Sequence, residues 1–330
     1  MPPRVVRNCR KGRRGGLSRA EWQDLSARFG DRMKLDRQLS GCTTYRIGGR
    51  AGAVLLPRSA EDVSEALSWC YENGRPWIVL GLGSNVLISD EGFPGLVLRM
   101  GKGFDAVLER DDASTVWKLA AGMPTPRLAR ETAKSGLAGV HKLIGVPGTV
   151  GGGVATNAGA HGQEYRQVVR DVEYVRGDGM MTYVTGPDIP WQYRRGLEGV
   201  VVTAVTFEFE TGDAAEELET IRQLQILRKE RTPYQMPSCG SVFKNPGVPA
   251  PGDGAATAES APLTAGQLID AAGMKGFRVG AAEVSRMHAN YIVNLGGATA
   301  AEVHAVIDAV RGRVFGAFGV ELELEVRIIG

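Results

Sequence analysis

The chain has 330 residues, which is long enough for two or three domains with hydrophobic cores of their own. Hydrophobic residues make up 43% and charged residues 23%, as in ordinary globular proteins, and a net charge of +2 argues against a dedicated nucleic-acid binder. No run approaches the roughly 18 apolar residues of a membrane span, so we expect no membrane partner.

The first 16 positions carry basic residues and no acidic ones: Arg4, Arg7, Arg10, Lys11, Arg13 and Arg14. Such a stretch is either an arm for nucleic acid or a membrane surface, or more commonly a disordered, solvated tail, which is what we expect. No apolar segment of the secretory type follows it. The four cysteines form no C-x-x-C pair and the four histidines no H-E-x-x-H motif. The pattern favours a reducing cytoplasm and predicts no metal site.

Helix caps and apolar periodicity predict alternating elements over the first half of the chain. Ser59 and Asp62 resemble a helix cap, and Pro124 suits the first position of a helix. We expect helices at 17–29, 60–69 and 124–135, and strands at 53–56, 77–80, 96–98 and 116–121.

Residues 168–210 then alternate apolar and polar side chains, which predicts half-buried strands, with a hairpin turn at Asp178-Gly179. Thr264, and Thr299 with Glu302, are predicted helix N-caps. We expect a strand at 200–210, helices at 214–231, 264–272 and 299–319, an exposed loop at 246–261 and a closing strand at 321–329.

The composition changes near residue 212, and no internal repeat is present. The first part mixes strands, helices and glycine turns, and the last part resembles a small α+β layer. We therefore expect a basic tail at 1–16 and a smaller domain at 213–330.

Two glycine-rich turns are the strongest functional signal: Gly81–Asn85 and the run Gly145–Gly162, in which seven residues are glycine. Glycine is used where the backbone has positive φ or where something approaches it closely. A pair of such turns suits a dinucleotide whose pyrophosphate is bound by backbone N–H groups. The run is neither a P-loop nor a Rossmann motif. The alternative is a set of turns in a tightly packed region.

Three further patterns could carry chemistry. PSCGSVFKNP (237–246) offers Ser241 as a proton donor, or else a simple turn serine. Glu325 and Arg327 are two residues apart, so both point to one face of a strand, where they could also be a solvated pair. Arg194 could bind a carboxylate or phosphate, or be a surface charge.

A series of motifs in the same order resembles the UDP-N-acetylenolpyruvoylglucosamine reductase (MurB) family in its compact form, from about residue 40 to the end. The motifs are TTYRIGG (43–49), LGLGSNVLISD (80–90), IGVPGTVGGGVATNAGAHG (144–162), YR (193–194), SCGSVFKNP (238–246), AGQLIDAAGMKG (265–276), VSRMHANYIVN (284–294) and EVRIIG (325–330).

The resemblance implies an α+β protein with a two-part FAD-binding domain of the vanillyl-alcohol-oxidase (PCMH) type, whose subdomains lie at 17–100 and 101–212, a smaller substrate-binding domain, and NADPH as the reductant. The implied catalytic residues are Ser241, Arg194 and Glu325. The implied substrate-binding residues are Tyr193, Lys244, Asn245 and Arg327. The implied cofactor-binding residues are Arg46, Gly81, Gly83, Ser84, Asn85, Gly145, Pro147, Gly148, Thr149, Gly151, Gly152, Asn157 and Gly159.

The implied activity is the reduction of the enolpyruvyl ether of UDP-N-acetylglucosamine in peptidoglycan precursor synthesis, by a bacterial cytoplasmic monomer. Gly196 departs from the serine that the family often has two residues after its catalytic arginine. The basic tail and the 246–261 loop also lack a clear counterpart. The alternatives are an FAD-dependent sugar or alcohol oxidase and a catalytically silent nucleotide-binding protein.

Overall fold

The computed structural model describes residues 22–110, 114–247 and 262–330. The chain folds into two compact units. Unit 1 comprises Met1–Arg37, Arg50–Leu82 and Phe93–Arg228, and unit 2 comprises Gln38–Gly49, Gly83–Gly92 and Lys229–Gly330. Two short loops from the N-terminal third of the chain therefore belong to the C-terminal unit. The expected division into four consecutive parts, at 1–16, 17–100, 101–212 and 213–330, remains a prediction.

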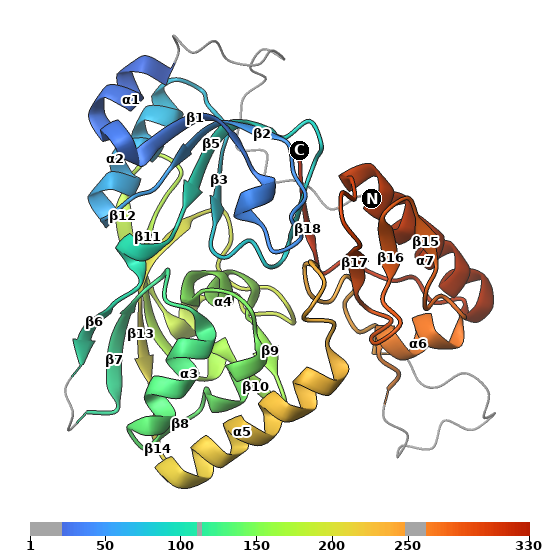
Figure 1. The fold of residues 1–330 in the computed structure, drawn as a ribbon. Coiled ribbons are helices and arrows are strands. Elements are labelled where there is room, and N and C mark those ends of the chain that lie inside the picture. The colour runs from blue at the N-terminus through green and yellow to red at the C-terminus, as the bar shows by residue number, and fades with distance from the viewer. Residues whose placement is uncertain (1–21, 111–113, 248–261) are drawn as a thin grey trace. The chain divides into compact units, whose positions relative to one another are not determined.

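The first sheet of unit 1 is partly parallel and is packed against by two helices (Figure 1). The strand order is β1 (Met33–Gln38), β2 (Arg50–Leu55), β5 (Phe93–Arg99) and β3 (Trp77–Leu80), with β5 parallel to both β2 and β3. The helices are α1 (Gln23–Phe29) and α2 (Ala60–Glu72). Ser59 caps α2 by accepting the N–H of Asp62 at 3.3 Å, as predicted. Trp22 and Trp69 stack in the core, with ring centroids 5.3 Å apart.

The second sheet of unit 1 is antiparallel and has five strands. The strand order is β12 (Met181–Thr185), β11 (Val169–Val175), β13 (Val201–Glu208), β7 (Val116–Ala120) and β6 (Val107–Arg110). Its core contains the fully buried rings of Trp117, Tyr165 and Phe207. Three helices complete the unit: α3 (Thr125–Lys134), α4 (Val150–Thr156) and α5 (Ala214–Arg231).

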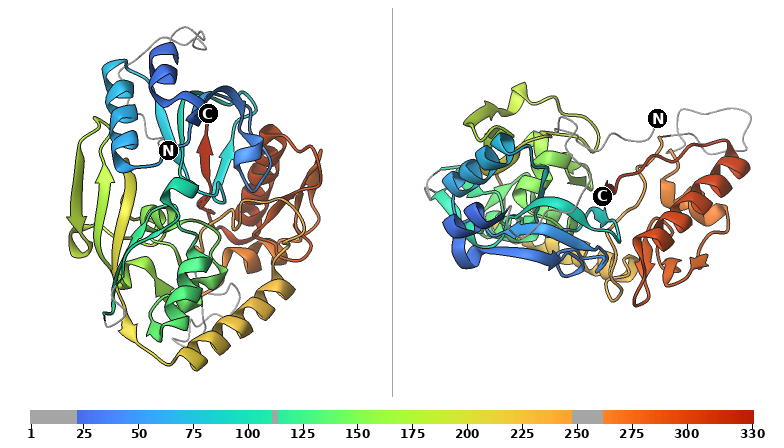
Figure 2. Two further views of the ribbon diagram at one scale, coloured as in Figure 1. Left: turned by 60° about the vertical axis from the view of Figure 1, so that its left-hand side comes forward. Right: turned by 90° about the horizontal axis from the view of Figure 1, so that it is seen from above.

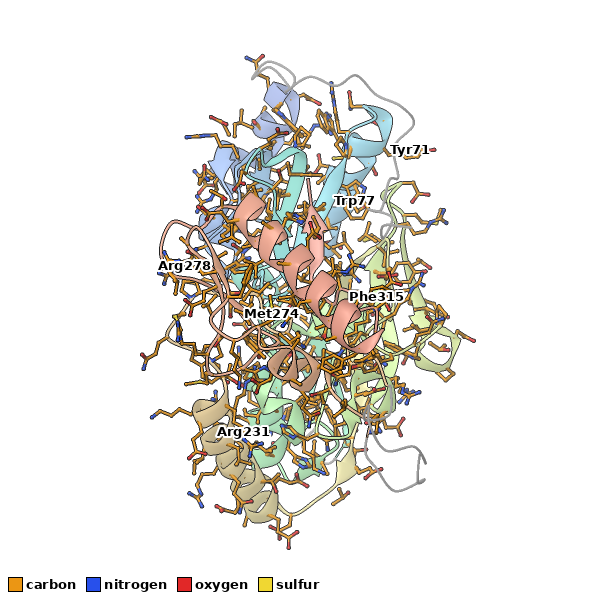
Figure 3. All side chains as sticks on the ribbon, turned by 90° about the vertical axis from the view of Figure 1, so that its right-hand side faces the viewer. Tyr71, Trp77, Arg231, Met274, Arg278 and Phe315 are labelled. Carbon is orange, nitrogen blue, oxygen red and sulfur yellow. The ribbon has the colours of Figure 1, made fainter. Side chains whose placement is uncertain are left out.

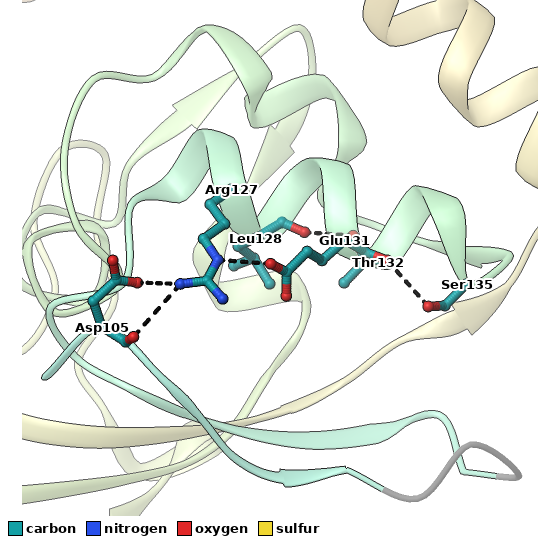
Figure 4. A network of polar contacts seen from close by, with 6 residues as sticks. All are labelled: Asp105, Arg127, Leu128, Glu131, Thr132 and Ser135. Carbon is teal, nitrogen blue, oxygen red and sulfur yellow. Dashed lines mark hydrogen bonds and ion pairs between the residues drawn. The ribbon is translucent and has the colours of Figure 1, made fainter.

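Polar contacts fix α3 to the loop before β6 (Figure 4). The Arg127 guanidinium lies 2.7 Å from Asp105 and 2.6 Å from Glu131, which is one turn further along α3. The Ser135 hydroxyl donates to the Glu131 carbonyl at 3.1 Å, which also accepts the backbone N–H of Ser135 at 3.3 Å at the helix end. These contacts orient the helix that precedes the glycine run.

Short elements connect these layers. They are η2 (Gly30–Arg32), η3 (Ser40–Cys42), η4 (Lys102–Phe104), β8 (Leu137–Ala138), η5 (His141–Gly145), β9 (Gly159–Ala160), β10 (Gln163–Glu164), η6 (Tyr165–Gln167), η7 (Gly186–Asp188) and β14 (Glu210–Thr211).

Unit 2 is a small α+β layer, as its composition predicted. A sheet of β15 (Arg278–Val279), β16 (Ala282–Val284) and β17 (Ile292–Asn294) packs against the long helix α7 (Ala300–Phe318), and α6 (Ala265–Ala271) also packs on α7 (Figures 1 and 2). Figure 3 shows α7 with Phe315 labelled on its exposed side. The last strand, β18 (Arg327–Ile329), pairs in parallel with β4 (Val86–Ile88).

The capped helices are confirmed: Thr264 begins α6, and Thr299 with Glu302 forms the capping box of α7, which ends at Gly319 with φ of +68°. The closing strand is shorter than predicted, since only Arg327–Ile329 forms a ladder. Residues 323–326 instead bond to residues 242–244, as described below.

The predicted first helix is found as Gln23–Phe29, and its beginning lies outside the described residues. The tail at 1–16 and positions 248–261 of the predicted loop also lie outside them. Among the helices that the structure describes, none combines the length and apolar character needed to cross a bilayer.

Candidate active site

The first residue of one glycine turn, Gly81, meets the other turn within unit 1. A Cβ on Gly81 would lie 2.5 Å from Oγ1 of Thr149, so only glycine allows the first turn to approach the second. Thr149 is buried, and its Oγ1 accepts the N–H of Gly152 at 3.4 Å as the N-cap of α4. Gly81 therefore packs directly against the second turn, and the binding of a dinucleotide by the two turns remains a prediction.

The glycines of the run divide into two kinds. A Cβ on Gly153 would overlap the ring of Tyr165, and one on Gly159 would lie 2.7 Å from Glu164, so packing explains these two. Gly152 is exposed, and a Cβ there would meet only Thr149, at 3.5 Å. Packing does not require glycine at this position, and the space before it is open. Gly152 therefore presents bare backbone to open space, and its contact with a bound phosphate remains a prediction.

Helix α5 supports the start of the run through side-chain contacts at two places. The Glu217 carboxyl lies against Nδ1 of the buried His141, in the η5 segment just before the run. Burial lowers the pKa of His141 and raises the pKa of Glu217, so both groups are shifted toward their neutral forms. The Arg228 guanidinium packs directly on Gly145. Because α5 contacts both places, it fixes the path of the chain into the glycine run.

Arg194 has a strained backbone, with φ of +58°. A positive φ is uncommon for a residue with a long side chain and is found disproportionately at functional sites. The guanidinium lies 4.9 Å from the ring centroid of the half-exposed Tyr193. It also lies 3.2 Å from where a Cβ of Gly159 would be. Unit 1 therefore brings these three predicted site residues together.

Asn157 also has a positive φ, +43°, which asparagine tolerates at the end of a helix. Its amide donates to Glu164 and to the Gln192 carbonyl, both at 3.1 Å, and accepts the N–H of Arg166 at 3.2 Å. The Asn157 side chain therefore connects residues 164–166, which follow the run, to Gln192, which precedes Tyr193. Its predicted contact with the cofactor remains a prediction.

Unit 2 gathers two other predicted loops. The Thr44 N–H donates to the Gly83 carbonyl at 3.1 Å, and its Oγ1 donates to the Ser238 carbonyl at 2.7 Å. Thr44 thus links the loop of Arg46 (φ +56°) to the Gly83–Asn85 turn and to the segment that carries Ser241. Sequence reasoning missed this role of Thr44, because the partners are 39 and 194 positions away.

The segment of Ser241 is bonded to the segment of Glu325. The Val242 carbonyl accepts the N–H groups of Glu325 at 2.8 Å and Val326 at 3.3 Å. Asn85 donates its amide to the Glu325 carbonyl at 3.2 Å. The hydroxyl of Ser241 makes no hydrogen bond to any other residue that the structure describes. Two of the three predicted catalytic residues thus lie on directly bonded backbone segments.

The neighbours of these residues have charges and partners of their own. Lys244 Nζ lies 2.7 Å from the exposed Glu323 carboxylate, and Asn245 Oδ1 accepts the first N–H of α6 at 3.1 Å. The Arg327 N–H donates to the Asn85 carbonyl at 3.1 Å.

Burial, together with the nearby Glu325 carboxylate, raises the pKa of Cys239 to about 12, so this thiol stays protonated. Among the described residues there is no cluster of His, Cys, Asp or Glu side chains that could hold a metal ion.

Similarity to known protein families shows which class of protein this chain belongs to. The family model of an FAD-binding domain matches residues 51–185, which include the glycine run and the Gly81 turn. The chain is thus an FAD-binding flavoprotein, and the open backbone at Gly152 suits such a cofactor. The family model described as the C-terminal domain of UDP-N-acetylenolpyruvoylglucosamine reductase matches residues 232–329.

Whole-chain relatives define the family. The chain is 40% identical over 295 residues to UDP-N-acetylenolpyruvoylglucosamine reductase of Heliobacterium modesticaldum, covering 88% of this chain and 89% of that one. It is 40% identical to the same enzyme of Rubrobacter xylanophilus, covering 90% and 95%. The crystal structure of MurB from Thermus caldophilus matches with a TM-score of 0.71 at 32% identity, covering 90% and 98%. The chain belongs to the UDP-N-acetylenolpyruvoylglucosamine reductase family, and the predicted α+β class with a flavin domain is confirmed.

Gly152→Val is expected to fold normally and to lose most of the bound FAD. The added side chain has room, but it occupies the open space in front of the backbone that we assign to the cofactor phosphates. The measurement is the flavin-to-protein absorbance ratio after purification. Gly312→Val is the control, because Gly312 lies in α7 with nothing within 4 Å of its Cβ position. Full flavin content in Gly152→Val would contradict the assignment.

Gly196→Ser is expected to destabilise the chain. A Cβ there would overlap the Val154 carbonyl and lie 2.7 Å from the Trp191 ring. Overpacking of this kind costs about 1–3 kcal/mol. Denaturant unfolding measures it, with Gly41→Ser as control, since Gly41 has nothing within 4 Å. Equal stability of the two variants would mean that the backbone at Gly196 adjusts without cost.

Proposed function

We propose that this chain catalyses the NADPH-dependent reduction of the enolpyruvyl ether of UDP-N-acetylglucosamine to UDP-N-acetylmuramate. The observation that carries the proposal is the direct backbone bonding of the Ser241 and Glu325 segments through Val242, within a domain that matches the family model. Curated relatives with this enzyme name cover about nine-tenths of the chain.

When bound, FAD supplies the hydride transfer between NADPH and the terminal vinylic carbon of the substrate. The substrate carbon next to the carboxylate then carries enolate-like negative charge. Ser241 donates its hydroxyl proton to that carbon, which is basic enough to take it without a separate activated base. Its hydroxyl is not committed to another described residue, which supports this role.

The Arg194 guanidinium stabilises the developing negative charge, and the Glu325 carboxylate acts with it as a hydrogen-bond acceptor. Tyr193, Lys244, Asn245 and Arg327 bind the substrate, the last three at its diphosphate or carboxylate. The pair of Lys244 with Glu323 supports this assignment: Glu323 is 74% exposed, so the pair is weak and the ammonium can turn to an anionic ligand. Preorganised donors of this kind are each worth about 3–4 kcal/mol in the transition state.

In unit 1 we propose that the cofactor is contacted by backbone groups of the glycine turns. The residues are Gly81, Gly145, Pro147, Gly148, Thr149, Gly151 and Gly152. The cofactor contacts proposed for unit 2 come from Arg46, Gly83, Ser84 and Asn85. We further propose that the protein works as a cytoplasmic monomer in peptidoglycan precursor synthesis, and so serves cell shape and division.

The test is anaerobic turnover. The purified protein, mixed with NADPH or NADH and the enolpyruvyl nucleotide, should oxidise more than one equivalent of nicotinamide per flavin only when the nucleotide is present, with NADPH preferred. The product should carry two additional hydrogens by mass spectrometry. Oxidation that needs oxygen and a free sugar, and not the enolpyruvyl group, would instead indicate an oxidase.

A further inference from the structure

Asn290 holds the segment that follows Ser241 in the way that a neighbouring strand would. Its side-chain Oδ1 accepts the N–H of Phe243 at 2.9 Å, and its Nδ2 donates to the Phe243 carbonyl at 2.8 Å. Its backbone carbonyl accepts the N–H of Val242 at 2.9 Å. One residue thus fixes three backbone groups in the two positions after the proposed proton donor.

The opposite side of the same segment is bonded to the residues around Glu325. Val242 accepts the Glu325 and Val326 N–H groups, and the Lys244 N–H donates to the Glu323 carbonyl at 2.8 Å. Val242 and Phe243 are fully buried or nearly so. The chain at 242–244 is therefore held from two sides, by Asn290 and by the residues around Glu325.

Asn290 is itself held in one orientation. It is 5% exposed, and its N–H donates to Nδ1 of His288 at 3.2 Å. Burial lowers the pKa of His288, which favours the neutral ring that can accept this bond. The ring of His288 also packs against Tyr291, with centroids 4.8 Å apart. The amide is thus fixed before any substrate binds, as preorganised positioning requires.

We propose that Asn290 is a positioning residue for proton transfer: its side-chain amide sets the place of Ser241 through Phe243 and Val242. This inference rests on the proposed role of Ser241 as the proton donor. The sequence shows Asn290 between apolar residues in HANYIVN, which indicates a buried amide. It does not identify Phe243 as the partner of that amide, because Phe243 is 47 positions away.

Two variants of Asn290 test the proposal. Asn290→Asp keeps an acceptor for the Phe243 N–H but sets a second oxygen against the Phe243 carbonyl. Asn290→Ser removes the amide without adding charge, and decides the question if the Asp variant does not fold. For both we expect normal reduction of bound FAD by NADPH. Reoxidation by the enolpyruvyl nucleotide should be about 10²-fold slower, with a larger solvent deuterium isotope effect, because misplacement by roughly 1 Å has that cost.

Asn294 is the matched control, since it is a buried amide in the same motif. Its amide bonds to the Tyr45 carbonyl at 3.0 Å and to Gly296 and Ala298, and not to the Ser241 segment. Asn294→Asp and Asn294→Ser should change both half-reactions, per bound FAD, by the same factor. A selective loss in the Asn294 variants, or equal losses in the two half-reactions of the Asn290 variants, would overturn the proposal.

Ser241→Ala, measured in parallel, separates the two claims. If it loses substrate-driven reoxidation while the Asn290 variants keep it, the role of Ser241 stands and that of Asn290 is wrong. If Ser241→Ala reoxidises normally, both are wrong.

Discussion

Ser241→Ala is expected to keep the oxidation of NADPH and to lose the reduction of the enolpyruvyl nucleotide. The proton that Ser241 donates is needed only after hydride has reached the substrate, so the first half-reaction does not involve it. Loss of a positioned general acid costs about 10²–10⁴-fold. The hydroxyl has no partner among the described residues, so removing it should not disturb the fold.

Stopped-flow absorbance of the flavin measures the two half-reactions of Ser241→Ala separately. Ser238→Ala is the control: Ser238 lies in the same segment, but its established contact is through its backbone carbonyl, which accepts from Thr44 and survives the change. Ser238→Ala should therefore behave as the unchanged chain in both halves. Equal loss in both halves for Ser241→Ala would make Ser241 a structural residue.

Glu325→Gln is expected to fold and to bind FAD, and to lose turnover by about 10²–10⁴-fold, the range for losing a positioned group that takes part in proton transfer. The segment is held by backbone bonds to Val242 and Asn85, which the substitution leaves in place. Only the negative charge and one acceptor are removed. An interaction made in the transition state lowers kcat more than it raises KM.

Glu321→Gln is the control for Glu325, since its side chain is 84% exposed and its contact is with Arg311 at 3.7 Å. It should leave turnover unchanged. Steady-state kinetics together with the flavin spectrum make the comparison. Near-normal kcat in Glu325→Gln, with full flavin content, would remove Glu325 from the catalytic residues.

Local signals in the sequence predicted much of the fold. The caps at Ser59, Thr264 and Thr299 involve residues three positions apart, so the pattern that sets each helix start lies within the sequence window itself. The hairpin at Asp178-Gly179 is found between β11 and β12 for the same reason, with Gly179 at φ of +88°.

Long-range pairing could not be predicted in this way. Residues 321–326 alternate apolar and charged side chains, as a strand does, but the backbone groups of residues 323–326 bond to residues 242–244, about 80 positions earlier. The ladder therefore begins only at Arg327, where β4 is the partner. Likewise, no local signal assigns the loops 38–49 and 83–92 to the C-terminal unit.

The glycine run shows how one sequence signal can have two causes. The high density of glycine predicts a backbone site for the cofactor phosphates, and close packing is the alternative explanation. Gly153 and Gly159 are explained by packing against Tyr165 and Glu164, whereas Gly152 is not. That the run binds the cofactor remains a prediction, and the surroundings of each glycine decide which position can test it.

The central claim is that reduced flavin on this chain passes its hydride to an enolpyruvyl nucleotide. The most direct measurement is to reduce the protein with one equivalent of NADPH under strict exclusion of oxygen, and then to add the enolpyruvyl ether of UDP-N-acetylglucosamine. The account predicts that the oxidised flavin spectrum returns at once, with one UDP-N-acetylmuramate formed per flavin. A flavin that stays reduced until air is admitted would contradict it.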